Sequence, residues 1–197
     1  MFSGIILDIG TIEHATDRNG GLTLSISVNG STMGGVKLGD SLAVNGTCLT
    51  IVKVCDDSVD VDVSRETLNC TTGLATQGAR VNLERALLLT DRLNGHLVSG
   101  HIDGIGEVTK LSDLKESLKL SVRAPRPLLK YIAVKGSITI NGTSLTINQT
   151  KDDIFDVNLI PYTLQTTTLG SLSAGDLVNI EIDQVARYVE RIMQIQA

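Results

Sequence analysis

A short polar segment occurs twice in the sequence, as Asn-Gly-Thr-Cys-Leu-Thr at residues 45–50 and as Asn-Gly-Thr-Ser-Leu-Thr at residues 141–146. Hydroxyl groups and backbone amides where a turn meets a strand can hold a flat, polar heterocycle. The pattern also fits a plain Asn-Gly hairpin turn followed by ordinary strand threonines, Thr50 and Thr146. Retention in both copies favours the binding role, because random change would blur polar surface positions sooner than core positions.

One position breaks the match between the two segments, since Cys48 stands where the second copy has Ser144. A thiol is more acidic and more nucleophilic than a hydroxyl, so Cys48 is a candidate nucleophile. The alternative is a small buried hydrophobic residue, the role that we expect for Cys55 and Cys70. An odd number of cysteines without Cys-x-x-Cys spacing argues against a disulfide framework or a zinc site.

Two of the three histidines lie close together, at His96 and His101. Their spacing places them on opposite faces of a strand, so we do not expect them to bind a metal jointly. Either one can act as an acid, a base or a hydrogen-bond donor near neutral pH. His14 lies in a polar region that we expect to be a loop, where it would be a solvated bystander.

The chain consists of two copies of one unit, offset by 96 residues. When residues 41–72 are laid over residues 137–168, 15 of the 32 aligned positions are identical, against roughly two expected from ordinary composition. A period of this length is that of a small domain rather than of a solenoid repeat. The repeat predicts a first domain at residues 1–90 and a second at residues 91–183.

Apolar and polar residues alternate in both copies, for example at residues 22–28, 59–63 and 118–123. Strict alternation is typical of strands with one wet face, and Asn-Gly pairs mark turns between them. About six short strands in each copy favour a mainly β fold of two similar, closed, six-stranded barrels. We also expect two short helices in each copy, one of them at residues 127–132, where Pro127 stands at the start.

Residues 184–197 have no counterpart at the end of the first copy and are predicted to form a helix. Val185, Tyr188, Val189, Ile192 and Ile195 recur in this segment at helical spacing. The apolar stripe can pack back on its own barrel or against copies of itself in an oligomer. The pattern alone leaves both arrangements open.

Composition excludes several classes of partner. The 197 residues are 42% hydrophobic and carry a net charge of −5, with three Tyr, two Phe and no Trp. The absence of a basic run and the few aromatic residues argue against a nucleic-acid partner. No apolar stretch approaches the roughly 20 residues of a membrane-spanning helix, and residues 1–8 do not resemble a signal peptide. We therefore expect no membrane partner and a cytoplasmic location.

Eight motifs are distributed over both copies: Met-Phe-Ser-Gly-Ile (1–5), Gly-Asp-Ser-Leu-Ala-Val-Asn-Gly-Thr-Cys-Leu-Thr (39–50), Val-Asn-Leu-Glu-Arg-Ala (81–86), Gly-His-Leu-Val-Ser-Gly-His-Ile-Asp-Gly (95–104), Lys-Gly-Ser (135–137), Leu-Ile-Pro (159–161), Thr-Thr-Leu-Gly (167–170) and Val-Asn-Ile-Glu-Ile-Asp (178–183). Together they resemble the riboflavin synthase family, from residue 1 to about residue 192. Taken jointly, the motifs are highly specific, although no single motif would be.

The resemblance implies an enzyme that moves a four-carbon unit between two molecules of 6,7-dimethyl-8-ribityllumazine. The products would be riboflavin and 5-amino-6-ribitylamino-pyrimidinedione, formed without a metal or an organic cofactor. The resemblance also implies a homotrimer assembled through the C-terminal helix, with the active site between the N-terminal barrel of one subunit and the C-terminal barrel of the next. The resemblance further implies lumazine synthase as a partner. Two similar pockets suit a reaction between two identical molecules held close together.

Carried over residue by residue, the resemblance implies catalytic roles for Cys48, Ser41 and His101. Cys48, Ser41 or a water that they hold would add to one substrate, and His101 would move protons. The other expected site residues line or support the two pockets: Phe2, Gly4, Ile5, Ile6, Leu49, Thr50, Asp62, Val63, Ser64, Arg65, Glu66, Thr67, Gly100, Ile102, Lys135, Ser144, Leu145, Thr146, Asn158, Leu159, Ile160, Pro161, Tyr162, Thr163 and Asp183.

The alternative function is a non-catalytic lumazine- or flavin-binding protein on the same fold. Such proteins lose much of the second pocket and several catalytic positions, whereas Cys48, Ser41, His101 and Ser144 all stand in this sequence. A flavin reductase domain is a third interpretation, and it would require a nucleotide-binding domain beside the barrels.

Overall fold

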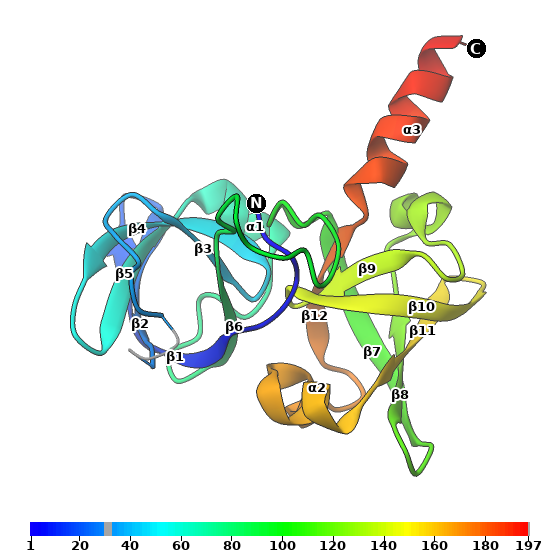
Figure 1. Ribbon diagram of the computed structural model, residues 1–197, viewed down its shortest axis with the longest axis horizontal. Helices are drawn as coiled ribbons and strands as arrows, with labels where there is room; N and C mark the ends of the chain where they lie inside the picture. The colour runs from blue at the N-terminus through cyan, green and yellow to red at the C-terminus, as the bar shows by residue number, and fades with distance from the viewer. Residues whose placement is uncertain (30–32, 197) are drawn as a thin grey trace.

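A computed structural model describes residues 1–29 and 33–196 and contains two closed β-barrels (Figure 1). The first barrel consists of β1 (Asp8–Arg18), β2 (Gly21–Ser27), β3 (Ser41–Val44), β4 (Thr47–Val54), β5 (Ser58–Val63) and β6 (Arg80–Arg85). The second consists of β7 (Gly104–Asp113), β8 (Leu118–Arg123), β9 (Ser137–Ile140), β10 (Thr143–Lys151), β11 (Ile154–Leu159) and β12 (Leu177–Ile182).

Both barrels have the same topology. The strand order is β1-β2-β5-β4-β3-β6 in the first and β10-β11-β8-β7-β12-β9 in the second, which is one circular order when β7 is matched to β1. Neighbouring strands such as β1 and β2 or β7 and β8 are antiparallel. The predicted mainly β fold with two six-stranded closed barrels is therefore confirmed.

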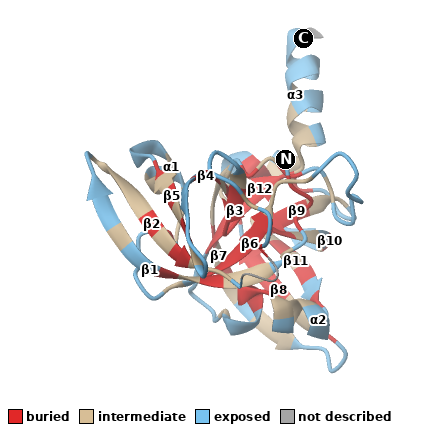
Figure 2. Cartoon of the chain, turned by 60° about the vertical axis from the view of Figure 1, so that its left-hand side comes forward, coloured by how far each residue is buried: buried red, intermediate tan, exposed pale blue. Residues whose placement is uncertain are grey.

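The alternating apolar residues fill the two barrel interiors. In β5, for example, Val59, Val61 and Val63 are buried, and the polar residues between them are partly exposed. Figure 2 shows the buried residues concentrated on the strands and the exposed residues on the loops and the C-terminal helix. Because each strand has one apolar face, closing the sheet buries that face and leaves no unpaired edge.

Two helices follow equivalent strands, α1 (Arg65–Cys70) after β5 and α2 (Pro161–Thr166) after β11. Two 3-10 helices, η1 (Arg126–Tyr131) and η2 (Thr168–Ser171), occur in the second copy. The helix predicted at residues 127–132 is confirmed as η1, whereas the described residues of the first copy contain one short helix instead of two. All three prolines lie in the second copy, so the first copy lacks a proline to start a further helix.

The C-terminal helix α3 (Gln184–Gln196) projects away from both barrels (Figure 1). Its apolar residues remain exposed, with Val185 at 57% and Ile192 at 58%. The apolar stripe therefore does not pack back on its own barrel, which removes one of the two arrangements that the sequence left open. Among the described residues, no helix is both long and apolar enough to cross a membrane.

The two Asn-Gly turns meet where the barrels touch. A Cβ atom added to Gly46 would lie 2.6 Å from the backbone nitrogen of Gly142, and one added to Gly142 would lie 2.7 Å from that of Gly46. Both glycines and the preceding Asn45 and Asn141 have positive φ, as hairpin turns of this type require. The close contact gives a structural reason why Asn-Gly persists in both copies, separate from any ligand.

Buried asparagines join the barrels reciprocally around these turns. The side-chain Nδ2 of Asn82 in β6 donates to the carbonyl oxygen of Asn141 at 2.9 Å, and its Oδ1 accepts from the backbone nitrogen of Thr168 at 2.7 Å. In β12, Asn179 makes the equivalent bonds to the first barrel, to Asn45 and to residue 72. The barrel interface is therefore polar, buried and hydrogen-bonded on both sides.

We predict that Asn82→Ala destabilises the protein, because it leaves the buried N–H of Thr168 and the carbonyl of Asn141 without partners. The free energy of unfolding should fall by about 2–4 kcal/mol in urea titrations at one protein concentration. The exposed Asn69→Ala in α1 is the control and should change it by less than about 0.5 kcal/mol. Equal effects of the two substitutions would contradict a structural role for the interface asparagines.

Candidate functional site

A segment of the second repeat, residues 97–103, lies directly on Cys48 of the first barrel. The backbone nitrogen of Cys48 donates to the carbonyl oxygen of Gly100 at 2.8 Å. A Cβ atom on Gly100 would lie 2.6 Å from the Cβ atom of Cys48, and the φ of Gly100 is +80°. Only glycine fits here, because it has no side chain to clash and adopts this φ without strain.

The same arrangement occurs at Ser144 with the copies exchanged. The backbone nitrogen of Ser144 donates to the carbonyl oxygen of Gly4 at 2.7 Å, and a Cβ atom on Gly4 would lie 2.6 Å from that of Ser144. Residues 1–7 thus cross to the second barrel while residues 97–103 cross to the first. We call these two stretches the crossing segments. Each crossing segment contacts both barrels. The predicted domain boundaries at residues 90 and 183 stay predictions.

Two buried glutamates hold the crossing segments in place. Glu84 in β6 accepts hydrogen bonds from the backbone nitrogens of Ser3 at 2.7 Å and Gly4 at 2.9 Å. Glu181 in β12 accepts from those of residues 99 and 100, at 2.7 and 3.0 Å. Burial raises the pKa of both carboxyls, and the N–H donors oppose that rise. A carboxylate with two amide donors is a strong, directional clamp.

Polar groups form a row across the outside of the first barrel. Strand pairing places Ser41 opposite Thr50, and Thr50 opposite Asp62. Cys48 lies two residues before Thr50 on the same strand and therefore on the same outward face. Asp62 is held by the Thr23 hydroxyl, whose Oγ1 donates to Oδ1 at 2.7 Å. The first barrel thus presents a thiol, two hydroxyls and a fixed carboxylate on one surface.

The second barrel repeats this row with different side chains. Thr146 is opposite Ser137, and Asn158 is opposite Lys119. The amide of Asn158 therefore replaces the carboxylate of Asp62, and the ammonium group of Lys119 replaces the hydroxyl of Thr23. Each half-site consists of a crossing segment and the row beside it. The two half-sites have the same backbone arrangement but carry different side chains.

The rims of the two half-sites differ in the same way. Ser64 Oγ caps α1 by accepting from the backbone nitrogen of Thr67 at 3.1 Å, and Arg65 contacts the carbonyl oxygen of Gly20. At the equivalent rim, Ile160 is 55% exposed and Tyr162 is 70% exposed. One rim is therefore polar and the other offers apolar surface to a ligand.

His96 pairs with Ser144, because its Nδ1 lies 2.8 Å from the serine Oγ. The other ring nitrogen, Nε2, is buried and has no hydrogen-bond partner among the described residues. Burial lowers the pKa of His96, and the charge of Asp183 opposes that shift. The imidazole is therefore neutral near pH 7 and able to exchange a proton with the hydroxyl. Asp183 also starts α3, since its Oδ1 accepts from the backbone nitrogen of Val185 at 3.0 Å.

The histidine that the sequence favoured, His101, lies elsewhere. It is exposed and follows Gly100, so it stands beside Cys48 of the first barrel and not beside Ser144. The two histidines therefore lie beside different half-sites. Among residues 1–29 and 33–196, no group of three or more His, Cys, Asp or Glu side chains is placed to hold a metal ion.

Some predicted site residues direct their side chains into the core. Phe2, Leu49, Val63 and Leu159 are buried, so only their backbone atoms can face a ligand. Phe2 packs with Ala43 and Val98, beside Cys48. The remaining predicted pocket residues lie at or near the surface: Ile5, Ile6, Glu66, Ile102, Lys135, Leu145, Pro161 and Thr163.

The expectation that Cys55 and Cys70 are buried is wrong, since both are exposed. Cys55 follows β4 at its hairpin to β5, and Cys70 ends α1, so neither position faces a core. Cys70 Sγ lies 3.4 Å from Glu66 Oε1, and this contact raises the pKa of the thiol. His14 is exposed as expected, but it lies in strand β1 and not in a loop.

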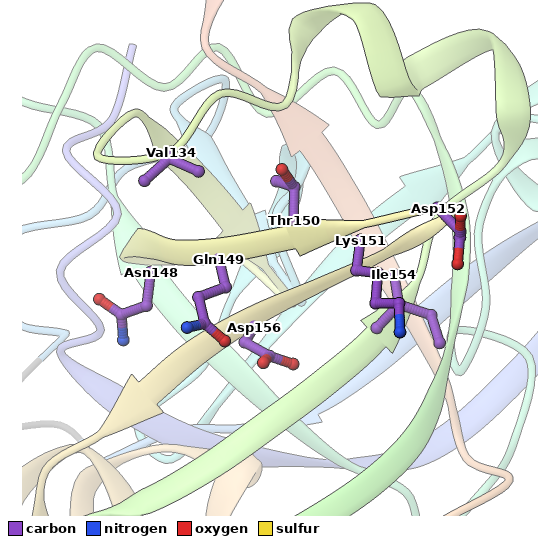
Figure 3. A pocket seen from close by; sticks show the side chains of 8 residues that line it. All are labelled: Val134, Asn148, Gln149, Thr150, Lys151, Asp152, Ile154 and Asp156. Carbon is purple, nitrogen blue, oxygen red and sulfur yellow. The ribbon is translucent and has the colours of Figure 1, made fainter.

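Two hollows lie along β10 and β11 of the second barrel. The larger, about 700 Å³, is lined by the residues labelled in Figure 3, among them Val134, Asn148 and Asp156. The smaller, about 400 Å³, shares Asn148, Gln149 and Asp156 and reaches the predicted site residue Asn158. Cys48 and Ser144 line neither hollow, whereas Asn158 of the second half-site lines the smaller one.

Sequence reasoning missed the two clamping glutamates and the pairing of His96 with Ser144. The signal for the glutamates was present, because Glu84 and Glu181 align between the repeats, each two residues after an asparagine. The histidine pairing carried no local signal, since 48 residues separate its members.

Comparison with known proteins matches this architecture. A family model described as "Lumazine binding domain" matches residues 3–86 and again residues 99–183. The chain is similar to a riboflavin synthase of Brucella abortus (strain 2308), with 42% identity over 202 residues that cover 100% of both chains.

Two solved structures of LumP are also similar, each with 30% sequence identity over 92% of this chain and 99% of the other. LumP complexed with riboflavin gives a TM-score of 0.85. LumP complexed with 6,7-dimethyl-8-(1'-D-ribityl) lumazine gives 0.82.

Proposed function

Because the chain belongs to the riboflavin synthase family and contains two lumazine-binding domains, we propose that it converts two molecules of 6,7-dimethyl-8-ribityllumazine into riboflavin and 5-amino-6-ribitylamino-pyrimidinedione. A four-carbon unit leaves one lumazine and joins the other, so the two products together keep every atom of the substrates. The observation that carries the proposal is the pair of matched half-sites, each completed by a crossing glycine.

Each half-site binds one lumazine in this proposal. The first offers the outward groups of Cys48, Thr50 and Asp62, and the second offers those of Thr146 and Asn158. Hydroxyl, amide and carboxylate groups suit the polar heterocycle and its ribityl chain. Binding two identical molecules in unlike surroundings lets one act as donor and the other as acceptor of the four-carbon unit.

The side chains divide the chemistry. The methyl group on one lumazine ring loses a proton, and a nucleophile adds to the ring of the other. The nucleophile is the Cys48 thiol, the Ser41 hydroxyl or a water that they hold, and it is released when the four-carbon unit has moved. His101 shuttles protons in the first half-site, and the pair His96–Ser144 exchanges them in the second.

The active site lies between the N-terminal barrel of one subunit and the C-terminal barrel of the next, in a homotrimer assembled through α3. The exposed apolar stripe of α3 supports this assembly, because an apolar helix face in water is stabilised by packing against the same face of another subunit. The protein would act in the cytoplasm, and lumazine synthase would be a further partner.

The direct test mixes purified protein with 6,7-dimethyl-8-ribityllumazine, without added metal or nucleotide, and follows riboflavin by absorbance. We expect one riboflavin for every two lumazines consumed. Tight binding of lumazine without riboflavin formation would favour the alternative, a non-catalytic lumazine-binding protein such as the LumP relatives suggest. A protein that neither binds lumazine nor forms riboflavin would refute both functions. The nucleophile assignments fail if Cys48→Ser and Ser41→Ala each retain normal turnover.

A mixing experiment tests whether the active site is shared between subunits. Cys48→Ala inactivates the first half-site, and the double substitution His96→Gln with Ser144→Ala inactivates the second. Trimers refolded from an equal mixture should regain about a quarter of the wild-type activity per chain, because one site in four receives two native halves. A site contained within a single chain would regain none.

The pH profile tests His96. Since burial lowers its pKa, the neutral base is present at pH 7, and turnover should fall only as the pH drops below 6.5. Asp183→Asn should move this acid limb to lower pH, because the Asp183 charge raises the His96 pKa. Asparagine also caps helices, so α3 should remain intact. His96→Gln should abolish the limb, and an unchanged limb would show that another group titrates.

A further inference from the structure

Asp103 ends the crossing segment that lies on Cys48, and it also contacts α3. Its carboxylate binds Arg187 through both oxygens, with Oδ1 at 2.8 Å and Oδ2 at 3.0 Å from Nη2. The same Oδ2 accepts from the backbone nitrogen of Ile182 at 2.9 Å. Three residues before Asp103, Gly100 accepts the hydrogen bond of the Cys48 amide. A short, bonded path therefore runs from the C-terminal helix to the candidate nucleophile.

The internal repeat shows that this carboxylate is an addition. The equivalent position in the first copy is Leu7, and both residues make the same backbone bond: Leu7 to Leu83 and Asp103 to Ile180. The backbone therefore does not require an acid at this position. The acid occurs only in the copy that is followed by α3, and no comparable helix follows β6 in the described residues of the first copy. This asymmetry ties the Asp103 carboxylate to α3, in addition to its bond with Ile182 at the end of β12.

We propose that the Asp103–Arg187 ion pair is a positioning device that couples α3 to the Cys48 half-site. Together with Glu181, which holds residues 99 and 100, it fixes the crossing segment of residues 97–103, and with it Gly100 and His101, against the first barrel. Asp103 and Arg187 touch no reacting atom and act only through this segment. The inference rests on the proposed function, because it makes α3 responsible for the geometry of the site as well as for assembly.

A second contact anchors the same helix without reaching the crossing segment. Glu190 of α3 binds the side chains of Lys130 and Tyr131 in η1. Removing Glu190 therefore loosens α3 while leaving Asp103 and its partners untouched. This contact supplies a matched control that separates a general loosening of the helix from the proposed coupling.

The experiment measures amide hydrogen exchange by NMR on the full-length protein, together with sedimentation and steady-state kinetics. In Arg187→Met and Asp103→Asn, the Cys48 amide should exchange about tenfold faster or more, because the segment that carries Gly100 loses one of its anchors and opens more often. The Ser144 amide, bonded to Gly4, is the internal reference and should not change. Arg187→Lys keeps the charge and should restore part of the protection.

In the kinetics, Arg187→Met should lower kcat by about tenfold to a hundredfold with little change in KM, since misplacing a reacting group costs rate rather than binding. The oligomeric state should be unchanged. Glu190→Gln should leave the Cys48 amide and kcat near wild type.

An unchanged Cys48 amide in Arg187→Met, or an equal effect of Glu190→Gln, would overturn the coupling. The exchange measurement does not depend on turnover. If the wild-type protein forms no riboflavin but Arg187→Met selectively loses protection of the Cys48 amide, the proposed function is refuted and the coupling stands.

Discussion

Two backbone hydrogen bonds, from the Cys48 amide to Gly100 and from the Ser144 amide to Gly4, are the contacts on which the remaining structure of the site depends. Each joins one barrel to a segment that belongs to the other repeat, so neither half-site is complete within its own copy. The bonds require glycine at residues 4 and 100, and they require Glu84 and Glu181 to hold the amides of those segments. Packing of the barrel interiors sets the shape of the strands, and these bonds then place the functional groups.

The duplication provides symmetry in the backbone and leaves the side chains free to differ. The thiol of Cys48 stands opposite the hydroxyl of Ser144 in the repeat alignment, and the carboxylate of Asp62 opposite the amide of Asn158. A reaction that treats two identical molecules differently needs this combination, because the binding geometry must match while the local chemistry must not. The pairing of His96 with Ser144 extends the difference, since the position equivalent to His96 in a true repeat would precede Met1.

Local pattern was enough to predict the barrels, because period-two alternation and Asn-Gly turns are encoded within a few residues. The same alternation could have shown that Leu49 and Val63 face the core. The sequence could not show the contact of Gly46 with Gly142 or of His96 with Ser144, because those contacts arise only after both barrels have closed. The prediction for Cys55 and Cys70 is wrong because burial follows position in the fold rather than residue type: one lies at a hairpin and the other at a helix end.

The crossing segments also determine where the chain can tolerate new material. Leu88 and Leu89 in the connection between the barrels are exposed, and residues 88–94 form neither strand nor helix. The barrels are joined by Asn82, Asn179 and the crossing segments, so this stretch only maintains the continuity of the polypeptide. Loops of this kind accept insertions, cuts and length changes at little cost in stability. A reporter, an epitope or a second enzyme could therefore be inserted between the barrels, whereas the residues on either side of that loop have no such freedom.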